Sequence, residues 1–253
     1  VSGLGNLKVV LNQVFKHAME SELIEQNPVS GITLQGKKKF KVNPLTEKGA
    51  ADLLDQANEY RKGMFYPPLL TLLRTGLRVG ELCGLQWADI NFEERSIRVS
   101  KSLTSGELST TKNGKERTVD MSLHLTENLR AMKKEKQKEA LRKGYPFPVW
   151  VFTRKSGDPL REANVRTALH RSLEMAGLPR MRTHDLRHSY ATIRLLRGHD
   201  IGDVSYQMGH SSIKITFDVY THWIPGKFKD QVDSLDTQPN ATYAQPVGMV
   251  QNK

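Results

Sequence analysis

The chain of 253 residues is 38% hydrophobic and 26% charged, which excludes a collagen-like or wholly disordered protein and suits one large domain with a smaller piece. Its 38 Lys and Arg residues outnumber 27 Asp and Glu residues, and the net charge of +11 favours a polyanionic partner such as nucleic acid. With Cys83 as the single cysteine and no apolar run near about 18 residues, a disulfide framework and a membrane span are excluded and a cytoplasmic protein is expected.

An amphipathic helix is the first predicted element. Apolar residues recur at spacings of three and four between Leu7 and Ala18, and Asn27-Pro28 ends the pattern. One helix cannot bury such a stripe alone. We therefore expect residues 1–34 to be the end of a domain whose earlier part precedes this chain.

A basic linker is predicted over residues 35–44. This stretch is poor in apolar residues and rich in lysine. It is either a solvated linker only or a strap that contacts DNA phosphates, for which Lys37, Lys38 and Lys39 are the candidates.

Residues 45–225 are predicted to form an α+β, mainly helical domain with a small antiparallel sheet. Helix caps, Pro in a first turn and Gly at a helix end predict the helices. Residues 96–102 and 116–121 alternate between apolar and polar and predict strands, connected through a Ser-Gly turn and an Asn113-Gly114 turn. The predicted helices begin near Pro67, Arg78, Ser122 and Ala163, and two of them end at Gly76 and Gly177. Thr46 and Thr183 are the predicted N-caps of two more helices.

Polar chemistry concentrates in residues 183–188, whose sequence is Thr-His-Asp-Leu-Arg-His. On a helix, His184, Arg187 and His188 share one face. The two histidines stand four apart, as in the zinc motif H-E-x-x-H. However, Asp185 replaces the catalytic glutamate of that motif and no further ligand signature follows, so we expect no metal site. Histidines that pack in a core or cap a helix remain the alternative.

Two further motifs flank this cluster. TGLRVGEL at residues 75–82 lies upstream, and MGHSS at residues 208–212 lies downstream, with Tyr220 ten residues after His210. Taken in order, an Arg, a Lys in a hairpin, His-x-x-Arg, Gly-His and a Tyr resemble the catalytic domain of the tyrosine recombinases, also called the phage integrase family. The candidate catalytic residues are Arg78, Lys112, His184, Arg187, His210 and Tyr220.

The resemblance implies site-specific DNA strand cleavage and rejoining through a covalent 3′-phosphotyrosine, for integration and excision of a mobile element such as a prophage. It implies no metal and no nucleotide cofactor. The implied partners are double-stranded DNA attachment sites, a homotetramer on DNA, and accessory DNA-bending or directionality factors. Residues 45–225 would be the catalytic domain and residues 1–34 a C-terminal fragment of the helical core-binding domain. Residues 226–253, which lack apolar periodicity, would form a flexible C-terminal tail.

The residue types suit the opening of a phosphodiester without a metal ion. The resemblance makes Arg78 and Arg187 the clamp on the scissile phosphate, since guanidinium offers a planar fork to phosphate oxygens. His184 and His210 would donate hydrogen bonds to the same oxygens, and His184 is also a candidate for deprotonating the nucleophile. Tyr220 would attack phosphorus, with the arginines favouring its phenolate.

Other positions have rivals or supporting roles. Lys112 would be the general acid to the leaving 5′ oxygen, with Lys115 as its rival. Glu81 resembles the acidic residue that orients the catalytic site in this family, with a surface ion pair as the alternative. His188 would support the site without touching the phosphate, and Lys214 is a candidate DNA contact because of its charge. The alternative nucleophiles are Tyr190, Tyr206 and Tyr243.

Three other functions compete with this interpretation. A catalytically silent DNA-binding regulator on the same scaffold would explain the positive charge, but not five intact catalytic motifs. A zinc hydrolase would explain His184 and His188, but not Tyr220. A type IB topoisomerase would share the chemistry, but the family-like motifs favour a recombinase.

Overall fold

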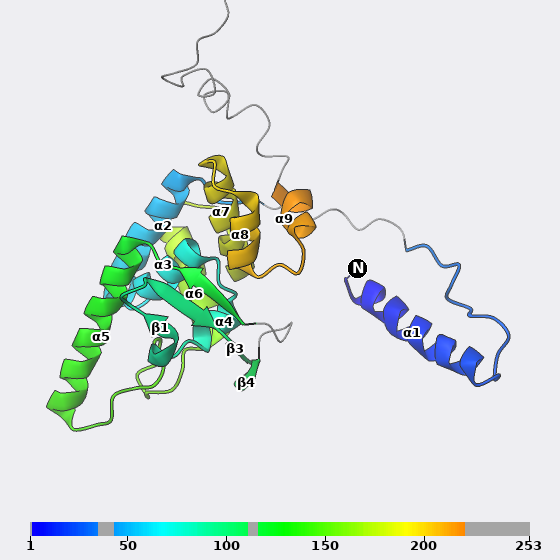
Figure 1. The fold of residues 1–253 in the computed structure, drawn as a ribbon, viewed down its shortest axis with the longest axis horizontal. Helices are drawn as coiled ribbons and strands as arrows, with labels where there is room; N and C mark the ends of the chain where they lie inside the picture. The colour runs from blue at the N-terminus through cyan, green and yellow to red at the C-terminus, as the bar shows by residue number, and fades with distance from the viewer. Residues whose placement is uncertain (1, 35–42, 111–115, 221–253) are drawn as a thin grey trace, which may run out of the picture. The chain divides into compact units, whose positions relative to one another are not determined.

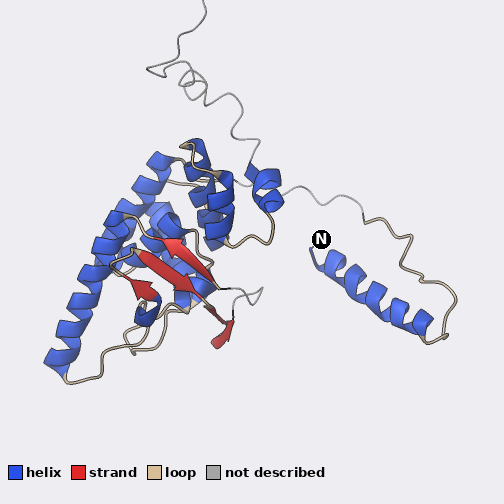
Figure 2. Ribbon diagram, viewed as in Figure 1, coloured by secondary structure: helices blue, strands red, loops and turns tan. Residues whose placement is uncertain are grey.

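The chain divides into two compact units, residues 1–43 and 44–253. The computed structural model describes residues 2–34, 43–110 and 116–220 (Figure 1). Helices make up most of the described part of the second unit, and its short strands gather in one region (Figure 2). Among the described helices, none is both long enough and apolar enough to cross a membrane.

The first unit confirms the predicted N-terminal helix, α1 (Ser2–Glu20). The segment after α1 turns back and binds it, because Asn27 Nδ2 donates to Asn12 Oδ1 at 3.2 Å. The apolar stripe of α1 includes Leu7 and Val10, which are 52% and 54% exposed. The predicted apolar stripe is therefore not buried by the rest of this unit.

The second unit confirms most of the predicted helices and their caps. Thr46 Oγ1 accepts a hydrogen bond from the Gly49 backbone N–H at 3.0 Å, as an N-cap does. Gly76 and Gly144 end two helices with left-handed φ values of 64° and 69°. The helical elements are α2 (Glu47–Glu59), η1 (Tyr60–Gly63), α3 (Tyr66–Thr75), α4 (Val79–Cys83), η2 (Trp87–Asp89), α5 (Leu123–Lys143), α6 (Glu162–Met175), α7 (Thr183–Leu196), α8 (Ile201–Met208) and α9 (Ile213–Tyr220).

Two features of the helices differ from the expectation. The cap of α7 is Arg182 rather than Thr183, because the Asp185 carboxylate accepts from the Arg182 backbone N–H at 2.7 Å. In addition, α8 and α9 were not predicted. Each has only eight residues, too few for a helical period to stand out.

The strands form two antiparallel groups rather than one sheet. The first has the order β1-β2-β5, and the second pairs β3 with β4. The predicted Ser-Gly turn is confirmed between β3 and β4, with φ of 54° at Ser105 and 92° at Gly106. The predicted turn at Asn113-Gly114 lies outside the described residues. The strands are β1 (Ile90–Asn91), β2 (Ser96–Val99), β3 (Lys101–Thr104), β4 (Glu107–Thr110) and β5 (Arg117–Asp120).

Among the described residues of this unit, two buried clusters make up the core. The larger one joins α2, α3, α5 and α6 with β2 and β5. The smaller one lies between α7, α8 and α9, and it includes Tyr190, Met208 and Tyr220. Because α7 packs against α3 on one side and α8 on another, it brings three distant motifs of the sequence together.

Candidate active site

The first candidate residue, Arg78, lies between the end of α3 and the start of α4. Gly76 ends α3, and a Cβ at this position would lie 2.4 Å from Cδ1 of Tyr190, so the turn requires glycine. Arg78 then begins α4. Its backbone N–H donates to Glu81 Oε2 at 2.9 Å, and its Nη1 donates to Glu81 Oε1 at 3.0 Å. The Arg78 side chain keeps 32% of its surface exposed, so a ligand can reach it.

Glu81 forms a buried ion pair rather than the surface pair considered from the sequence. It is 3% exposed, and it accepts from both Nη1 and Nη2 of Arg117, at 3.0 and 2.7 Å. Burial disfavours the carboxylate, but the hydrogen bonds and charge of Arg117 outweigh burial and lower the pKa of Glu81. Glu81 is therefore a carboxylate that joins two guanidinium groups.

Arg117 was missed by the sequence analysis. It is the first residue of β5 and is 8% exposed, on the same inward side of the strand as Val119. The signal that could have found it is the alternation of this strand. Alternation places both residues on the core face, where an arginine needs a charged partner.

Arg187 is 2% exposed on α7 and connects two helix ends. Its Nη1 donates to the Gly76 backbone oxygen at 2.7 Å, and its Nη2 donates to the Met208 backbone oxygen. Burial, followed by the charge of Arg78, lowers the pKa of Arg187 to about 9. A guanidinium group has five N–H donors, and these two bonds leave three others for a ligand or neighbouring groups.

The predicted helix face of α7 carries two histidines beside the candidate nucleophile. The rings of His184 and His188 meet edge to face, with centroids 4.9 Å apart. His188 Nδ1 lies 2.5 Å from the hydroxyl oxygen of Tyr220, which is 2% exposed at the end of α9. His188 therefore contacts the predicted nucleophile directly, a contact that the sequence did not predict.

Burial governs the acid-base state of these groups. Burial and the charge of neighbouring His184 lower the pKa of His188 to about 4, and burial and Arg187 lower the pKa of His184. Burial also raises the pKa of Tyr220 above its ordinary value, although Arg187 acts in the opposite direction. The arginine effect expected from the sequence is present but is smaller than the effect of burial.

His210 follows Gly209, the left-handed residue that ends α8. Its Nδ1 lies 2.7 Å from Thr216 Oγ1 of α9. Burial, followed by the positive charges of Arg187 and Arg78, lowers the pKa of His210 to about 4. The ring is thus close enough to both arginines to share one site with them.

The remaining candidates lie apart or outside the described residues. Lys214 is exposed on α9, and its Nζ lies 4.0 Å from Oδ2 of Asp218. Of the alternative nucleophiles, Tyr190 accepts from Arg194 Nη1 at 2.8 Å, and Tyr206 is 60% exposed on α8. The residues outside the described part are Lys37, Lys38, Lys39, Lys112, Lys115 and Tyr243.

The zinc alternative can be compared with the geometry. Within residues 2–34, 43–110 and 116–220, no three His, Cys, Asp or Glu side chains are grouped as ligands for a metal ion. The rings of His184 and His188 contact each other, and the ring of His188 also contacts that of Tyr220.

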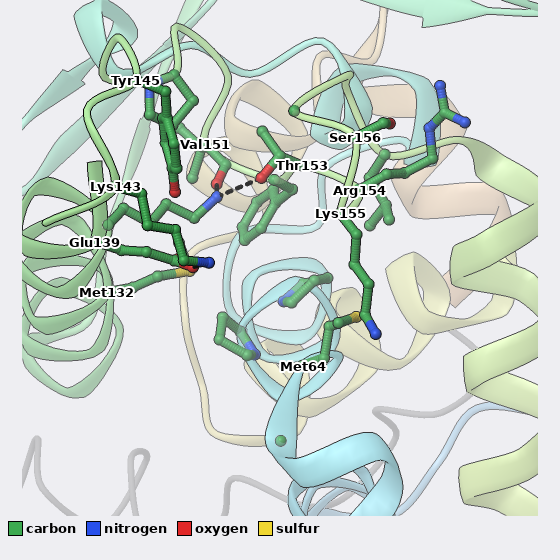
Figure 3. Close-up of a pocket in the computed structure, with 18 of the residues that line it drawn as sticks. Met64, Met132, Glu139, Lys143, Tyr145, Val151, Thr153, Arg154, Lys155 and Ser156 are labelled. Carbon is green, nitrogen blue, oxygen red and sulfur yellow. Dashed lines mark hydrogen bonds and ion pairs between the residues drawn. The ribbon is translucent and has the colours of Figure 1, made fainter. Parts of the chain in front are cut away.

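A separate pocket of about 1000 Å³ lies beside α5 and η1 (Figure 3). Lys136 lines it and donates to the backbone oxygen of Val151 at 2.9 Å and to Thr153 Oγ1 at 2.8 Å, bonds that Figure 3 marks. Burial lowers the pKa of Lys136 to about 8. None of the candidate catalytic residues that the structure describes lines this pocket.

The chain matches one family model and several known proteins. Residues 43–225 match the model of the phage integrase family. A tyrosine recombinase XerC-like protein of Caldanaerobacter subterraneus subsp. tengcongensis is 30% identical, covering 89% of this chain and 63% of that protein. The ICEBs1 integrase of Bacillus subtilis (strain 168) is 30% identical, covering 92% of this chain and 65% of that protein. The chain thus spans slightly less than two thirds of the length of these relatives.

Solved structures confirm the predicted fold class. The Tn1549 transposon integrase, in complex with a circular intermediate DNA, has a TM-score of 0.77 and 24% identity, covering 92% of this chain and 79% of that chain. At this identity the likeness establishes the fold, which is that of tyrosine recombinase catalytic domains.

Proposed function

The chain belongs to the phage integrase family, and on this premise we propose that it is a site-specific tyrosine recombinase. It would cleave and rejoin DNA strands through a covalent 3′-phosphotyrosine intermediate, for integration and excision of a mobile element. One observation carries the proposal: distant motifs meet around α7 and place two arginines, three histidines and one buried tyrosine in a single site. Those residues are Arg78, His184, Arg187, His188, His210 and Tyr220.

Arg78 and Arg187 would hold the scissile phosphate. Both are charged at neutral pH, and Arg78 is open to solvent. Charge on the non-bridging oxygens grows as phosphorus becomes five-coordinate, so preorganised donors stabilise that state more than the ground state. His184 and His210 would add neutral N–H donors to the same oxygens.

Tyr220 would supply the attacking oxygen. As its bond to phosphorus forms, the phenolic proton would pass to Nδ1 of His188, which lies 2.5 Å from the hydroxyl oxygen. A neutral imidazole with its proton on Nε2 can accept this proton. The bond from phosphorus to the 5′ oxygen then breaks, leaving a 3′-phosphotyrosine and a 5′ hydroxyl, and attack by a 5′ hydroxyl reverses the step.

The leaving oxygen also needs a proton. Lys112 is proposed as the donor, with Lys115 as the second candidate. The step then requires no nucleotide cofactor, because the bond energy of the phosphodiester is retained in the covalent intermediate. It requires no metal ion, because the arginines and histidines would stabilise the charge on the phosphoryl oxygens.

The organisation of the whole protein follows from the same proposal. Residues 45–225 would be the catalytic domain, residues 1–34 the end of a core-binding domain and residues 226–253 a tail exchanged between subunits. The protein would act in the cytoplasm on double-stranded attachment sites as a homotetramer, with accessory DNA-bending or directionality factors. The basic residues Lys37, Lys38, Lys39 and Lys214 would contact the DNA backbone.

The test is covalent capture on a nicked duplex that carries the attachment site, in excess EDTA. The proposal predicts a protein-DNA adduct on a denaturing gel with the wild-type chain and none with Tyr220→Phe. Tyr206→Phe is the matched control, because Tyr206 is an exposed tyrosine on α8 and should leave the adduct unchanged. DNA binding without any adduct would instead support the silent regulator.

A further inference from the structure

Arg117 bonds to two separate parts of the site. Its Nη1 and Nη2 donate to both carboxylate oxygens of Glu81, and its Nε donates to the backbone oxygen of Gln207 at 2.8 Å. Glu81 in turn binds Arg78, and Gln207 lies three residues before His210. One guanidinium group therefore joins the segments that carry two of the proposed catalytic residues.

Gly209 shows how closely this guanidinium group is packed. A Cβ at position 209 would lie 2.9 Å from Cδ, 3.0 Å from Nε and 3.1 Å from Cζ of Arg117. Gly209 also has a left-handed φ of 66°. The backbone turn and the contact with Arg117 both require glycine. The backbone of the turn that leads to His210 therefore packs directly against the side chain of Arg117.

The side chain of Gln207 connects the same turn to β5 through hydrogen bonds. Its Nε2 donates to Asp120 Oδ2 at 2.8 Å, and its Oε1 accepts from the Asp120 backbone N–H at 3.2 Å. Gln207 is 4% exposed. The two ends of β5, Arg117 and Asp120, therefore both hold the end of α8.

The two arginines that share Glu81 differ in what they can reach. The Arg78 side chain is 32% exposed, whereas that of Arg117 is 6% exposed. Each of the three guanidinium nitrogens of Arg117 already donates to Glu81 or to Gln207, so we do not assign Arg117 to the phosphate. Its charge instead balances Glu81, whose carboxylate would otherwise attract the guanidinium group of Arg78 more strongly.

We propose that Arg117 is a positioning residue for DNA cleavage. By occupying both oxygens of Glu81 it leaves Arg78 available to the scissile phosphate, and through Gln207 and Gly209 it fixes the turn that carries His210. This inference rests on the function proposed for the chain.

The charge part of the proposal predicts a rescue. Arg117→Met should lower the rate of adduct formation by about a hundredfold, the scale of a lost electrostatic group, while DNA binding is retained. Adding Glu81→Gln should then raise the rate by about tenfold, because the unbalanced carboxylate is gone. A purely structural role predicts the opposite, since the double variant has lost both members of the pair.

A conservative variant keeps the proposal testable if Arg117→Met does not fold. Arg117→Lys keeps the charge but not the fork that spans Glu81 and Gln207, so cleavage should fall less than in Arg117→Met. In this background Glu81→Gln should give no rescue. Arg171→Met, which breaks an exposed ion pair with Glu174, is the matched control and should cleave like the wild type. Melting temperatures establish that each variant is folded.

Either of two results would overturn the inference: an Arg117→Met variant that cleaves like the wild type, or a double variant that cleaves no faster than Arg117→Met. If the wild-type chain itself forms no adduct, the proposed function fails. Amide NMR spectra then still test whether Arg117 holds the turn that leads to His210. Loss of Arg117 should shift the amide resonances of Gly209 and His210. Unchanged resonances would contradict the proposal that Arg117 fixes this turn.

Discussion

The three imidazole rings of the site, those of His184, His188 and His210, lie among guanidinium groups. Burial and these positive charges lower the pKa of each, to about 4 for His188 and His210. All three are therefore neutral at pH 7. A neutral ring can donate one hydrogen bond and accept another, which suits both phosphate binding and proton transfer.

The lowered pKa values predict a loss of stability in acid. A histidine that is neutral in the folded chain binds fewer protons than in the unfolded chain, where its pKa is about 6.5. Stability from His188 and His210 is therefore complete above pH 6.5 and is lost as the pH falls toward 4. The melting temperature should fall by several degrees over this range, as measured by calorimetry.

Substitution of His188 and of His210 tests whether these two residues cause the acid sensitivity. His188→Gln and His210→Gln should each flatten the dependence of melting temperature on pH between 6.5 and 4. His17→Gln, at a histidine whose side chain is 84% exposed, should leave it unchanged. Parallel curves for all variants would show that other groups cause the acid sensitivity.

The contrast between Arg78 and Arg117 explains which site residues could be predicted. Arg78, His184, Arg187, His210 and Tyr220 occur in recognisable motifs in a fixed order, so identity and spacing were enough to select them. Arg117 belongs to no such motif. Its importance comes from the depth of its burial and from partners 36 and 90 positions away, which a linear pattern does not contain.

At the scale of secondary structure, the site is built on helix ends. Arg187 of α7 donates to the backbone oxygens of Gly76 and Met208, at the ends of α3 and α8. The last carbonyl groups of a helix lack partners within the helix, so a buried arginine both satisfies them and fixes the two ends relative to α7. This explains how Arg78 and His210 come to share one site.

The end of α3 yields a prediction about stability. Gly76→Ala and Gly144→Ala both place a side chain at a left-handed helix end, which costs about 1–2 kcal/mol. At position 144 nothing lies within 4 Å of the new Cβ, but at position 76 it would lie 2.4 Å from Tyr190. Gly76→Ala should therefore lower the free energy of unfolding by about 1–3 kcal/mol more than Gly144→Ala.

Urea unfolding of the two variants measures this difference. Equal losses for Gly76→Ala and Gly144→Ala would mean that Tyr190 moves aside at no cost, and that the contact does not fix the end of α3.

Helices with clear caps and the pairing of β2 with β5 could be predicted, whereas the separate hairpin of β3 and β4 could not. Thr46, Ser122 and Gly76 mark helix ends through local hydrogen bonds or backbone angles, which the sequence encodes directly. The predicted antiparallel pairing of residues 96–102 with residues 116–121 is confirmed by β2 and β5, while β3 and β4 pair with each other. Alternation alone does not tell where a chain leaves one sheet and begins another.

For the molecule as a whole, the net charge of +11 is the dominant feature, and most of it lies between residues 45 and 227. Positive charge that neutralises DNA phosphates releases counterions, so affinity depends steeply on salt. Binding through charge requires no particular sequence, and a duplex of any sequence can therefore test this contribution.

Titration of a labelled duplex at several salt concentrations should give a steep, linear fall of log K with log salt. Lys214→Ala should reduce the slope by about one if its ammonium group contacts a phosphate. Lys138→Ala, which removes an exposed lysine paired with Glu135 on α5, is the control and should not change it. Binding that does not respond to salt would contradict a phosphate-directed surface.

The most direct test of the central claim is to identify the amino acid that becomes joined to DNA. The adduct formed in EDTA would be digested with nuclease and trypsin and analysed by mass spectrometry. The account predicts a nucleotide on the peptide of residues 215–227, in which Tyr220 is the single tyrosine. A nucleotide on a peptide that contains Tyr190, Tyr206 or Tyr243 would contradict the assignment of the nucleophile and the proton transfer to His188 that depends on it.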